Sequence, residues 1–261
     1  MPRDFVDCIR GLLRLRPHII IFPILLVLAL FTAGCWTVNI PADNPDYFPM
    51  ARGVRWTYAR HAEVSQTGGN IVTNDGDVVC EVLDTAEKDG STAAILRGFP
   101  LGMDVWSEKT NTTNDVLIVC VPASQYHLLN TNVLAHFKSN EDLPLGLIDE
   151  NSLILDCPLI ASKRFGPFEQ LMRPDFSYCW FVESEEKVRF FGIKGVSPWR
   201  KHIVYHMVYL TRPDVQHVLF APSIGIVEYT YHHNGTPCDL RMRLKEFQSP
   251  NTSVDLRRKN K

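Results

Sequence analysis

The chain has 261 residues, of which 45% are hydrophobic, and a formal net charge of −2 at pH 7. This length suffices for one sizeable hydrophobic core or two small ones. The weakly acidic balance gives no reason to expect nucleic acid or an anionic membrane face as a partner, because binding to either depends on an excess of Lys and Arg.

The N-terminal segment combines positive charge with a short apolar run. Four arginines precede residue 17, and residues 19–31 are apolar. This run is shorter than the roughly 20 residues that span a bilayer and fits the roughly 7–15 residues of a signal-peptide core. It ends in TAGC at residues 32–35, which resembles the lipobox of bacterial lipoproteins. The resemblance implies cleavage after residue 34 and lipid attachment to the thiol of Cys35.

An uncleaved membrane anchor is the alternative for the same segment. A lipobox usually has a branched aliphatic residue three places before the cysteine, where this chain has Thr32. Residues 35–40 also extend the apolar run far enough to span a bilayer. The organisation that we expect is a signal peptide at 1–34, a tether at 35–45, an all-β domain at 46–248 and a basic, flexible tail at 249–261.

Short strand-like runs dominate the middle of the chain. Val54, Trp56 and Tyr58 alternate with polar residues, which is the period of a half-buried strand with Trp56 on its inner face. Residues 116–121 are continuously apolar and stop at a proline, which predicts a central strand covered on both faces. Further strands are expected at residues 78–83, 92–96, 103–106, 176–182, 188–193 and 203–210.

Helical periodicity is weak throughout the expected domain. Short helices are expected only at residues 168–172 and 132–137. The sequence therefore predicts an all-β fold, a single antiparallel meander of about ten strands that forms a curved half-barrel or a sandwich.

An Asn-Gly pair at residues 234–235 predicts a two-residue type I′ turn in a terminal hairpin. The register that follows places Tyr229 opposite Leu240 on an apolar face. It places Glu228 opposite Arg241 on the polar face, where they would form an ion pair.

Two motifs lie at the ends of the expected domain. YFP-x3-G-x2-W-x-Y covers residues 47–58, and FAP-x-x-G-x-V covers residues 220–227, before the terminal hairpin. With the lipobox, they resemble a largely uncharacterised group of bacterial envelope lipoproteins. The resemblance implies a β-rich, lipid-anchored protein of the bacterial cell envelope, with its domain on the periplasmic or outer side. It implies no catalytic residue.

Five cysteines lie in the expected domain: Cys80, Cys120, Cys157, Cys179 and Cys238. An oxidising compartment would allow one or two disulfides, and the sequence leaves their pairing open. The spacings are wide and contain no CxxC pair, so zinc and thioredoxin-type sites have no support. Cys80 and Cys120 lie in apolar runs, which predicts buried, inert thiols.

The histidines give little support to a metal site. His202 and His206 have the spacing of a helical metal pair, but their surroundings favour a strand. In a strand, four residues separate two side chains by about 13 Å, too far for one ion. His232 and His233 are adjacent and would point to opposite faces near a hairpin end. We expect no metal and no cofactor.

The polar candidates for chemistry are similarly weak. Nucleophile motifs such as GxSxG and SxxK are absent, and Ser223 is expected in the turn before the last hairpin. Residues 74–77 (NDGD) are expected to form a turn. Glu183, Glu185 and Glu186 are expected in a solvated loop.

Four aromatic residues could line a ligand pocket: Phe165, Phe168, Trp180 and Trp199. Aromatic residues in β proteins usually fill the core, so a packed interior is the competing interpretation.

The leading functional hypothesis is a lipid-anchored envelope protein that acts by binding and not by catalysis. It would be an accessory subunit of an envelope assembly or a carrier of an apolar ligand. The alternative is a hydrolase-like enzyme with a site built from loops. A carrier needs an apolar cavity of at least ~300 Å³. A scaffold needs a filled core with an exposed apolar patch, and an enzyme needs convergent titratable groups in a cleft.

Overall fold

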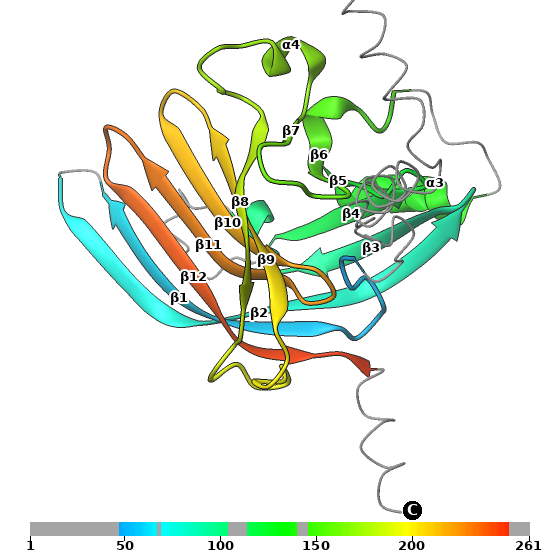
Figure 1. Cartoon of the computed structure of the whole chain (residues 1–261), viewed down its shortest axis with the longest axis horizontal. Helices are drawn as coiled ribbons and strands as arrows, with labels where there is room; N and C mark the ends of the chain where they lie inside the picture. The colour runs from blue at the N-terminus through cyan, green and yellow to red at the C-terminus, as the bar shows by residue number, and fades with distance from the viewer. Residues whose placement is uncertain (1–46, 67–68, 104–113, 140–145, 251–261) are drawn as a thin grey trace, which may run out of the picture. The chain divides into compact units, whose positions relative to one another are not determined.

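In the computed structural model, which describes residues 47–66, 69–103, 114–139 and 146–250, twelve strands pair into one sheet (Figure 1). The strands are β1 (Arg55–Ser65), β2 (Ile71–Lys88), β3 (Ser91–Arg97), β4 (Asp115–Val121), β5 (Gln125–Leu129), β6 (Leu153–Asp156), β7 (Arg164–Phe165), β8 (Trp180–Val188), β9 (His202–Leu210), β10 (Asp214–Ala221), β11 (Gly225–His233) and β12 (Cys238–Gln248). The prediction of a single antiparallel, curved all-β fold is confirmed.

Helical structure in the described residues is limited to single turns. The helices are η1 (Pro100–Gly102), η2 (Thr131–Val133), α3 (Leu134–Lys138), η3 (Glu150–Ser152) and α4 (Phe168–Leu171). The two expected helical segments, 132–137 and 168–172, are confirmed. None of the helices in the described part of the chain has the length and apolar character needed to cross a bilayer.

The strand order is β6-β5-β4-β3-β2-β1-β12-β11-β10-β9-β8-β7, and the strands pair antiparallel. The first and last strands therefore pair in the middle of the sheet. Its two edges, β6 and β7, are consecutive in the sequence. Figure 1 shows a sheet that curves strongly and brings these two edges toward each other. The result is a nearly closed, barrel-like sheet with one open seam.

The segment between β6 and β7 bridges this seam. The Lys163 ammonium donates hydrogen bonds to the backbone carbonyls of Asp156 (2.5 Å) and Pro158 (3.0 Å) and pairs with the Asp156 carboxylate at 2.9 Å. The backbone N–H of Ser162 donates to the Val182 carbonyl, and the Val182 N–H donates to the Lys163 carbonyl. The seam is therefore tied to β8 without a ladder between the two edge strands.

Inward-facing side chains fill the concave side of the sheet. Trp56 and Tyr58 on β1 are 1% and 2% exposed, and they alternate with the exposed Arg55 and the half-buried Thr57. This confirms that Trp56 lies on the inner face of its strand. Large side chains that are fully buried there include Trp56, Tyr58, Tyr126, Phe220, Leu96, Ile118, Leu159, Met207 and Met242.

The YFP motif inserts Phe48 into the centre of this core. Its ring stacks on Trp56 at 5.7 Å and on Phe220 at 6.3 Å between centroids. Phe99 and Tyr126 contact the same ring edge-on, at 5.9 and 6.1 Å. The segment before β1 thus closes the interior. Pro49 has no backbone N–H to donate, so this segment could not have continued β1 as a paired strand.

The two terminal motifs pack against each other. The Trp56 indole N–H donates to the Ile224 carbonyl at 2.5 Å, and the Tyr58 hydroxyl donates to the Ile226 carbonyl at 2.9 Å. Gly225 has φ +101°, and a side-chain carbon there would lie 3.4 Å from the Trp56 indole nitrogen. The buried residues of the two motifs therefore form one unit, which we call the motif cluster: Phe48, Trp56, Tyr58, Phe220, Ile224, Gly225 and Ile226.

The outer face of the sheet is covered locally by α3. On β4, Ile118 packs into the concave core, whereas Leu117 and Val119 pack against Leu134 and Phe137 of the helix region. The expectation of a central strand covered on both faces is confirmed.

The expected turn at residues 74–77 is wrong, because these residues continue β2. Their carboxylates find partners across the strands. Asp75 lies 2.7 Å from His61 on β1, and Asp77 pairs with Lys245 of β12 at 2.7 Å. Cross-strand charge pairs therefore let a polar, Gly-containing segment remain extended.

The region after residue 176 also differs from expectation. The strand expected at 176–182 begins only at Trp180, and Glu183, Glu185 and Glu186 belong to β8 instead of a loop. Of the strand expected at 188–193, Val188 ends β8, and the remaining residues belong to a loop that extends to residue 201. Glutamates on the exposed part of β8 hide its strand character, since both faces there are polar. Of the strand expected at 103–106, Met103 is outside any strand and residues 104–106 lie outside the described residues.

The expected register of the last hairpin is wrong by two residues. Tyr229 lies opposite Met242 instead of Leu240. A shift by two preserves the alternation of faces, so both Tyr229 and Met242 are buried as expected. The ion pair of Glu228 with Arg241 also forms, diagonally, at 2.7 Å.

Contacts with neighbouring turns explain the different register. Residues 234–237 connect the two strands. The Asn234 N–H donates to the Pro213 carbonyl at 2.6 Å, and the Ser65 N–H donates to the Pro237 carbonyl at 2.8 Å. Gly235 has φ +122°, but Asn234 lacks the positive φ that a type I′ turn requires. Ser223 lies in the turn before this hairpin, as expected, with φ +68°.

Candidate ligand pocket

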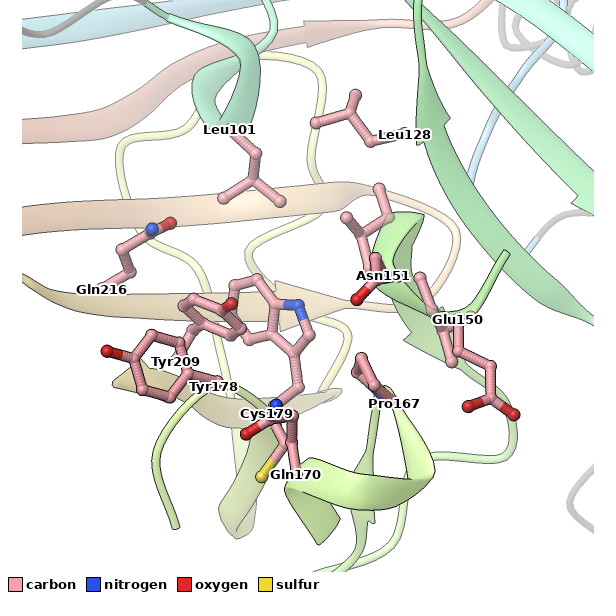
Figure 2. Close-up of a pocket in the computed structure, with 14 residues that line it drawn as sticks. Leu101, Leu128, Glu150, Asn151, Pro167, Gln170, Tyr178, Cys179, Tyr209 and Gln216 are labelled. Carbon is pink, nitrogen blue, oxygen red and sulfur yellow. The ribbon is translucent and has the colours of Figure 1, made fainter. Parts of the chain in front are cut away.

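A cavity of about 320 Å³ opens at the seam of the sheet (Figure 2). Its wall includes Leu153 and Ile154 of edge strand β6, and Gly166 and Pro167, which follow β7. Further lining comes from η1, β5, η3, α4, the start of β8, β9 and β10. The cavity therefore exists because the sheet does not close at this position.

Aromatic and aliphatic side chains form the apolar part of the wall. The rings of Trp180 and Tyr209 lie 5.2 Å apart, and Phe165 stacks on Trp180 at 6.4 Å. Figure 2 shows Leu101 and Leu128 on one side of the cavity and Tyr209 on the other. A flat apolar group could lie between these two sides.

Neutral amides and one carboxylate form the polar part of the wall. Asn151, Gln170 and Gln216 supply side-chain amides, and Glu150 supplies the carboxylate (Figure 2). The Glu150 carboxylate accepts the backbone N–H of the first residue of α4 at 2.9 Å. The Gln216 carbonyl accepts the Tyr229 hydroxyl at 3.3 Å. These contacts orient both side chains in advance of any ligand.

The segment before β8 holds an uncommon backbone conformation beside the cavity. Phe176 has φ +56° and Tyr178 has φ +64°, a region that costs non-glycine residues of order 1–3 kcal/mol. The Tyr178 N–H donates to the Leu210 carbonyl at 2.6 Å, and the Arg173 guanidinium lies 5.3 Å from the centre of the Tyr178 ring. These contacts hold Tyr178 at the cavity wall.

The Cys179 thiol and the Tyr209 phenol in the wall are not activated for nucleophilic chemistry. Cys179 donates its thiol hydrogen to the Phe176 carbonyl at 3.6 Å. Burial raises the pKa of this thiol above its ordinary value, and burial also raises the pKa of the Tyr209 hydroxyl. A raised pKa keeps both groups protonated at neutral pH.

The structure brings together two of the four aromatic residues expected to line a pocket. Trp180 lines the cavity, and the buried Phe165 supports it. Phe168 is 68% exposed on α4 and lies outside the lining. Trp199 is 84% exposed in the loop between β8 and β9, so its assignment to a pocket is wrong. The residue proposed for lipid attachment, Cys35, lies outside the described residues.

His202 and His206 lie on a strand, as expected, and not on a helix. His202 and His206 are both on β9, where His202 packs on the Phe190 ring at 5.4 Å and His206 lies 2.8 Å from Glu186. In residues 47–250, apart from the gaps in the description, no group of three or more His, Cys, Asp or Glu side chains could hold a metal ion.

All five cysteines of the domain are thiols in the structure. The prediction of a buried Cys80 is confirmed, whereas Cys120 is only half-buried. Burial raises the pKa of Cys157 to about 12 and that of Cys238 to about 11. Thiols with such pKa values react slowly with oxidants and disulfides at neutral pH.

Sequence reasoning missed most of the polar wall, including Glu150, Asn151, Gln170, Tyr209 and Gln216. These residues come from η3, α4, β9 and β10, which are far apart along the chain. None belongs to a motif, and the sequence gives no signal that they meet. Among the sequence candidates, Trp180 and the loop around residues 165–168 pointed to the correct region.

Comparisons with known proteins give little beyond this geometry. No protein-family model and no curated protein matches the chain. The crystal structure of a provisionally assigned exported protein with a YmcC-like fold, from Bacteroides fragilis NCTC 9343, is 14% identical. It covers 78% of this chain and 99% of its own, with a TM-score of 0.38. A provisionally assigned lipoprotein from Parabacteroides distasonis ATCC 8503 is 10% identical, covers 77% and 98%, and has a TM-score of 0.32.

Proposed function

We propose that this chain is a lipid-anchored bacterial envelope protein that acts by binding a small ligand in the seam pocket. The lipobox-like residues 32–35 and the terminal motifs support the envelope assignment. Cys35 carries the lipid in this proposal, and the membrane is the first partner of the protein.

The seam pocket is the observation that carries the binding role. Its volume of about 320 Å³ lies at the lower end of the range for ligand sites, roughly 300–1,000 Å³. On the concave side, buried side chains pack against one another in one core cluster, which favours a small ligand over a large apolar cargo. The wall combines Trp180 and Tyr209 with the amides of Asn151, Gln170 and Gln216. It suits a small, uncharged ligand with one apolar face and several hydrogen-bonding groups.

Binding is proposed in preference to catalysis because of the state of the reactive groups. The Cys179 thiol and the Tyr209 hydroxyl are both protonated at neutral pH, because burial raises the pKa of each. The Glu150 carboxylate accepts a hydrogen bond from the backbone of α4, which favours its role in shaping the wall. A hydrolase would require a nucleophile with a base within hydrogen-bond reach.

A cavity-filling substitution tests the pocket. Leu101→Trp adds bulk into the cavity, whereas Met172→Trp adds the same group at a side chain that is 73% exposed. With the neutral fluorescent probe N-phenyl-1-naphthylamine, we expect Leu101→Trp to weaken binding about tenfold and Met172→Trp to leave it unchanged. Equal binding by both variants and the native chain would contradict a ligand site at the seam.

Metabolic labelling with a fatty acid tests the anchor. The native chain should incorporate label, and Cys35→Ser should abolish it and leave the precursor uncleaved. Label on the Cys35→Ser variant, or no label on the native chain, would remove the lipoprotein assignment and leave the pocket to be judged separately.

A further inference from the structure

The loop between β8 and β9, residues 189–201, has apolar side chains on both of its sides. Ile193 is half-buried and Val196 is 8% exposed, and both pack against the core. Phe191 and Trp199 point away from it, with 72% and 84% of their surface exposed. The inward residues suffice to hold the loop on the domain, so folding does not explain the two outward aromatic side chains.

The backbone of this loop is fixed to the end of β12. The Lys194 N–H donates to the Lys245 carbonyl, and the Phe247 N–H donates to the Lys194 carbonyl, both at 2.9 Å. Gly195 has φ +84°, and a side-chain carbon there would lie 1.8 Å from the Phe247 carbonyl oxygen. Only glycine permits this approach, so the exposed aromatic side chains stand on a firmly attached loop.

Positive charge is concentrated in the segment that carries the two aromatic side chains. Residues 187–201 contain five Lys or Arg residues and no Asp or Glu, and all five are exposed. One acidic side chain packed against the loop is Glu246 of β12, which pairs with Lys194 at 2.7 Å. The glutamates of β8 precede this stretch, and Glu186 pairs with His206. The loop therefore presents a cationic surface with an aromatic centre.

The described chain begins at the same end of the sheet. Arg55, the first residue of β1, pairs with Gln248, next to the site where the loop joins β12. The Tyr47 carbonyl accepts the Ser223 N–H at 3.0 Å, in the turn after β10. The eleven residues between Cys35 and Tyr47 can span at most about 40 Å. A lipid on Cys35 would therefore keep this end within reach of the bilayer.

We propose that residues 187–201 form a membrane-contact surface that inserts Phe191 and Trp199 into the interface of an anionic lipid bilayer. Aromatic side chains favour the headgroup region, and Lys and Arg are attracted to anionic headgroups. The inference deepens the proposed function, because one lipid chain gives only marginal anchoring and a basic, aromatic surface supplies a second contact. The same contact would orient the domain with the seam pocket at the opposite end of β8.

The test is depth-dependent quenching of Trp199 fluorescence in the full chain. The protein is reconstituted into phosphatidylcholine vesicles with and without phosphatidylglycerol, with brominated acyl chains as quencher. The difference between native chain and Trp199→Phe isolates the emission of Trp199 from that of the other tryptophans. We expect this emission to be quenched by brominated lipid, protected from acrylamide, and more strongly quenched in anionic vesicles.

Two variants test whether the basic residues and this particular surface are responsible for the membrane contact. Arg200→Glu with Lys201→Glu should remove the preference for anionic vesicles, whereas Phe168→Ser, an exposed aromatic residue at the other end of β8, should change nothing. Trp199 that is quenched by acrylamide and untouched by brominated lipid would overturn the proposal. A photo-crosslinker at position 199 that captures an acidic protein and no lipid would overturn it equally. Fatty-acid labelling of Cys35 tests the lipid anchor separately. The anchor and the membrane-contact surface can therefore be contradicted independently of each other.

Discussion

Two aromatic regions of the molecule are built from similar residues but lie in opposite surroundings. In the motif cluster, Trp56 is 1% exposed, stacks on Phe48 and donates its indole N–H to a backbone carbonyl. In the β8–β9 loop, Trp199 is 84% exposed beside Arg200 and Lys201. The difference teaches that a Trp of this fold contributes to the core only where the backbone directs its side chain toward a packed face of the sheet. Stability should therefore depend on the first region and membrane contact on the second.

We expect the largest loss of stability when the Trp56 side chain is removed. Trp56→Ala removes a fully buried ring and one hydrogen bond, which should lower the free energy of unfolding by roughly 3–5 kcal/mol. Equilibrium denaturation of the full chain measures this change, with Trp199→Ala as the matched control. Similar losses for the two variants would break the distinction between the regions.

A smaller effect is expected where the loop joins the sheet. Gly195→Ala places a side chain against the Phe247 carbonyl, whereas Gly192→Ala has the same φ of +84° and open space. We expect a loss of about 2–3 kcal/mol for Gly195→Ala and about 1 kcal/mol for Gly192→Ala. The difference, measured by denaturation, isolates the attachment to β12. Identical losses would mean that the loop does not depend on that contact.

A single hydrogen bond of the motif cluster should contribute less to the free energy of unfolding than the Gly195 contact does. Tyr58→Phe keeps the ring and removes the hydroxyl that donates to the Ile226 carbonyl, at a cost of about 1 kcal/mol. Urea denaturation measures this loss, and the dependence of the unfolding free energy on urea concentration should keep the same slope. A variant as stable as the native chain would show that packing alone holds the two motifs together.

The smallest effect on stability is expected in the loop. Trp199→Ser should change the free energy of unfolding by less than about 0.5 kcal/mol, as for exposed substitutions elsewhere. The same variant should bind anionic vesicles more weakly in a flotation assay. A large loss of stability would instead place Trp199 among the residues that the fold requires.

Local sequence patterns predicted the fold class because they record burial directly. Alternation around Trp56 and the apolar run of β4 both identified strands correctly. Patterns failed where both faces are exposed, as in residues 74–77 and in the glutamates of β8. There, cross-strand partners such as Lys245 and His206 keep the chain extended, and these partners are distant in sequence.

The candidate site was harder to predict for a related reason. Trp180 was identified because aromatic residues are candidates for any pocket, but the same reasoning selected Trp199, which is exposed. Exposure depends on which side of the loop faces the core, and this is set by the contact of Gly195 with β12. The hairpin register failed similarly, since turns of other strands fix residues 234–237.

The pairing of β1 with β12 has a consequence for the order in which the chain can fold. β1 can pair with β12 only after β12 has been synthesised, so the centre of the sheet forms late. In a circular permutant, the end of the domain after β12 would be linked to the segment before β1, and the chain would be opened between β6 and β7. Its strands would then follow one another in the sheet in chain order, from β7 through β12 and β1 to β6. Such a circular permutant would contain almost only neighbouring contacts and should fold faster than the natural arrangement.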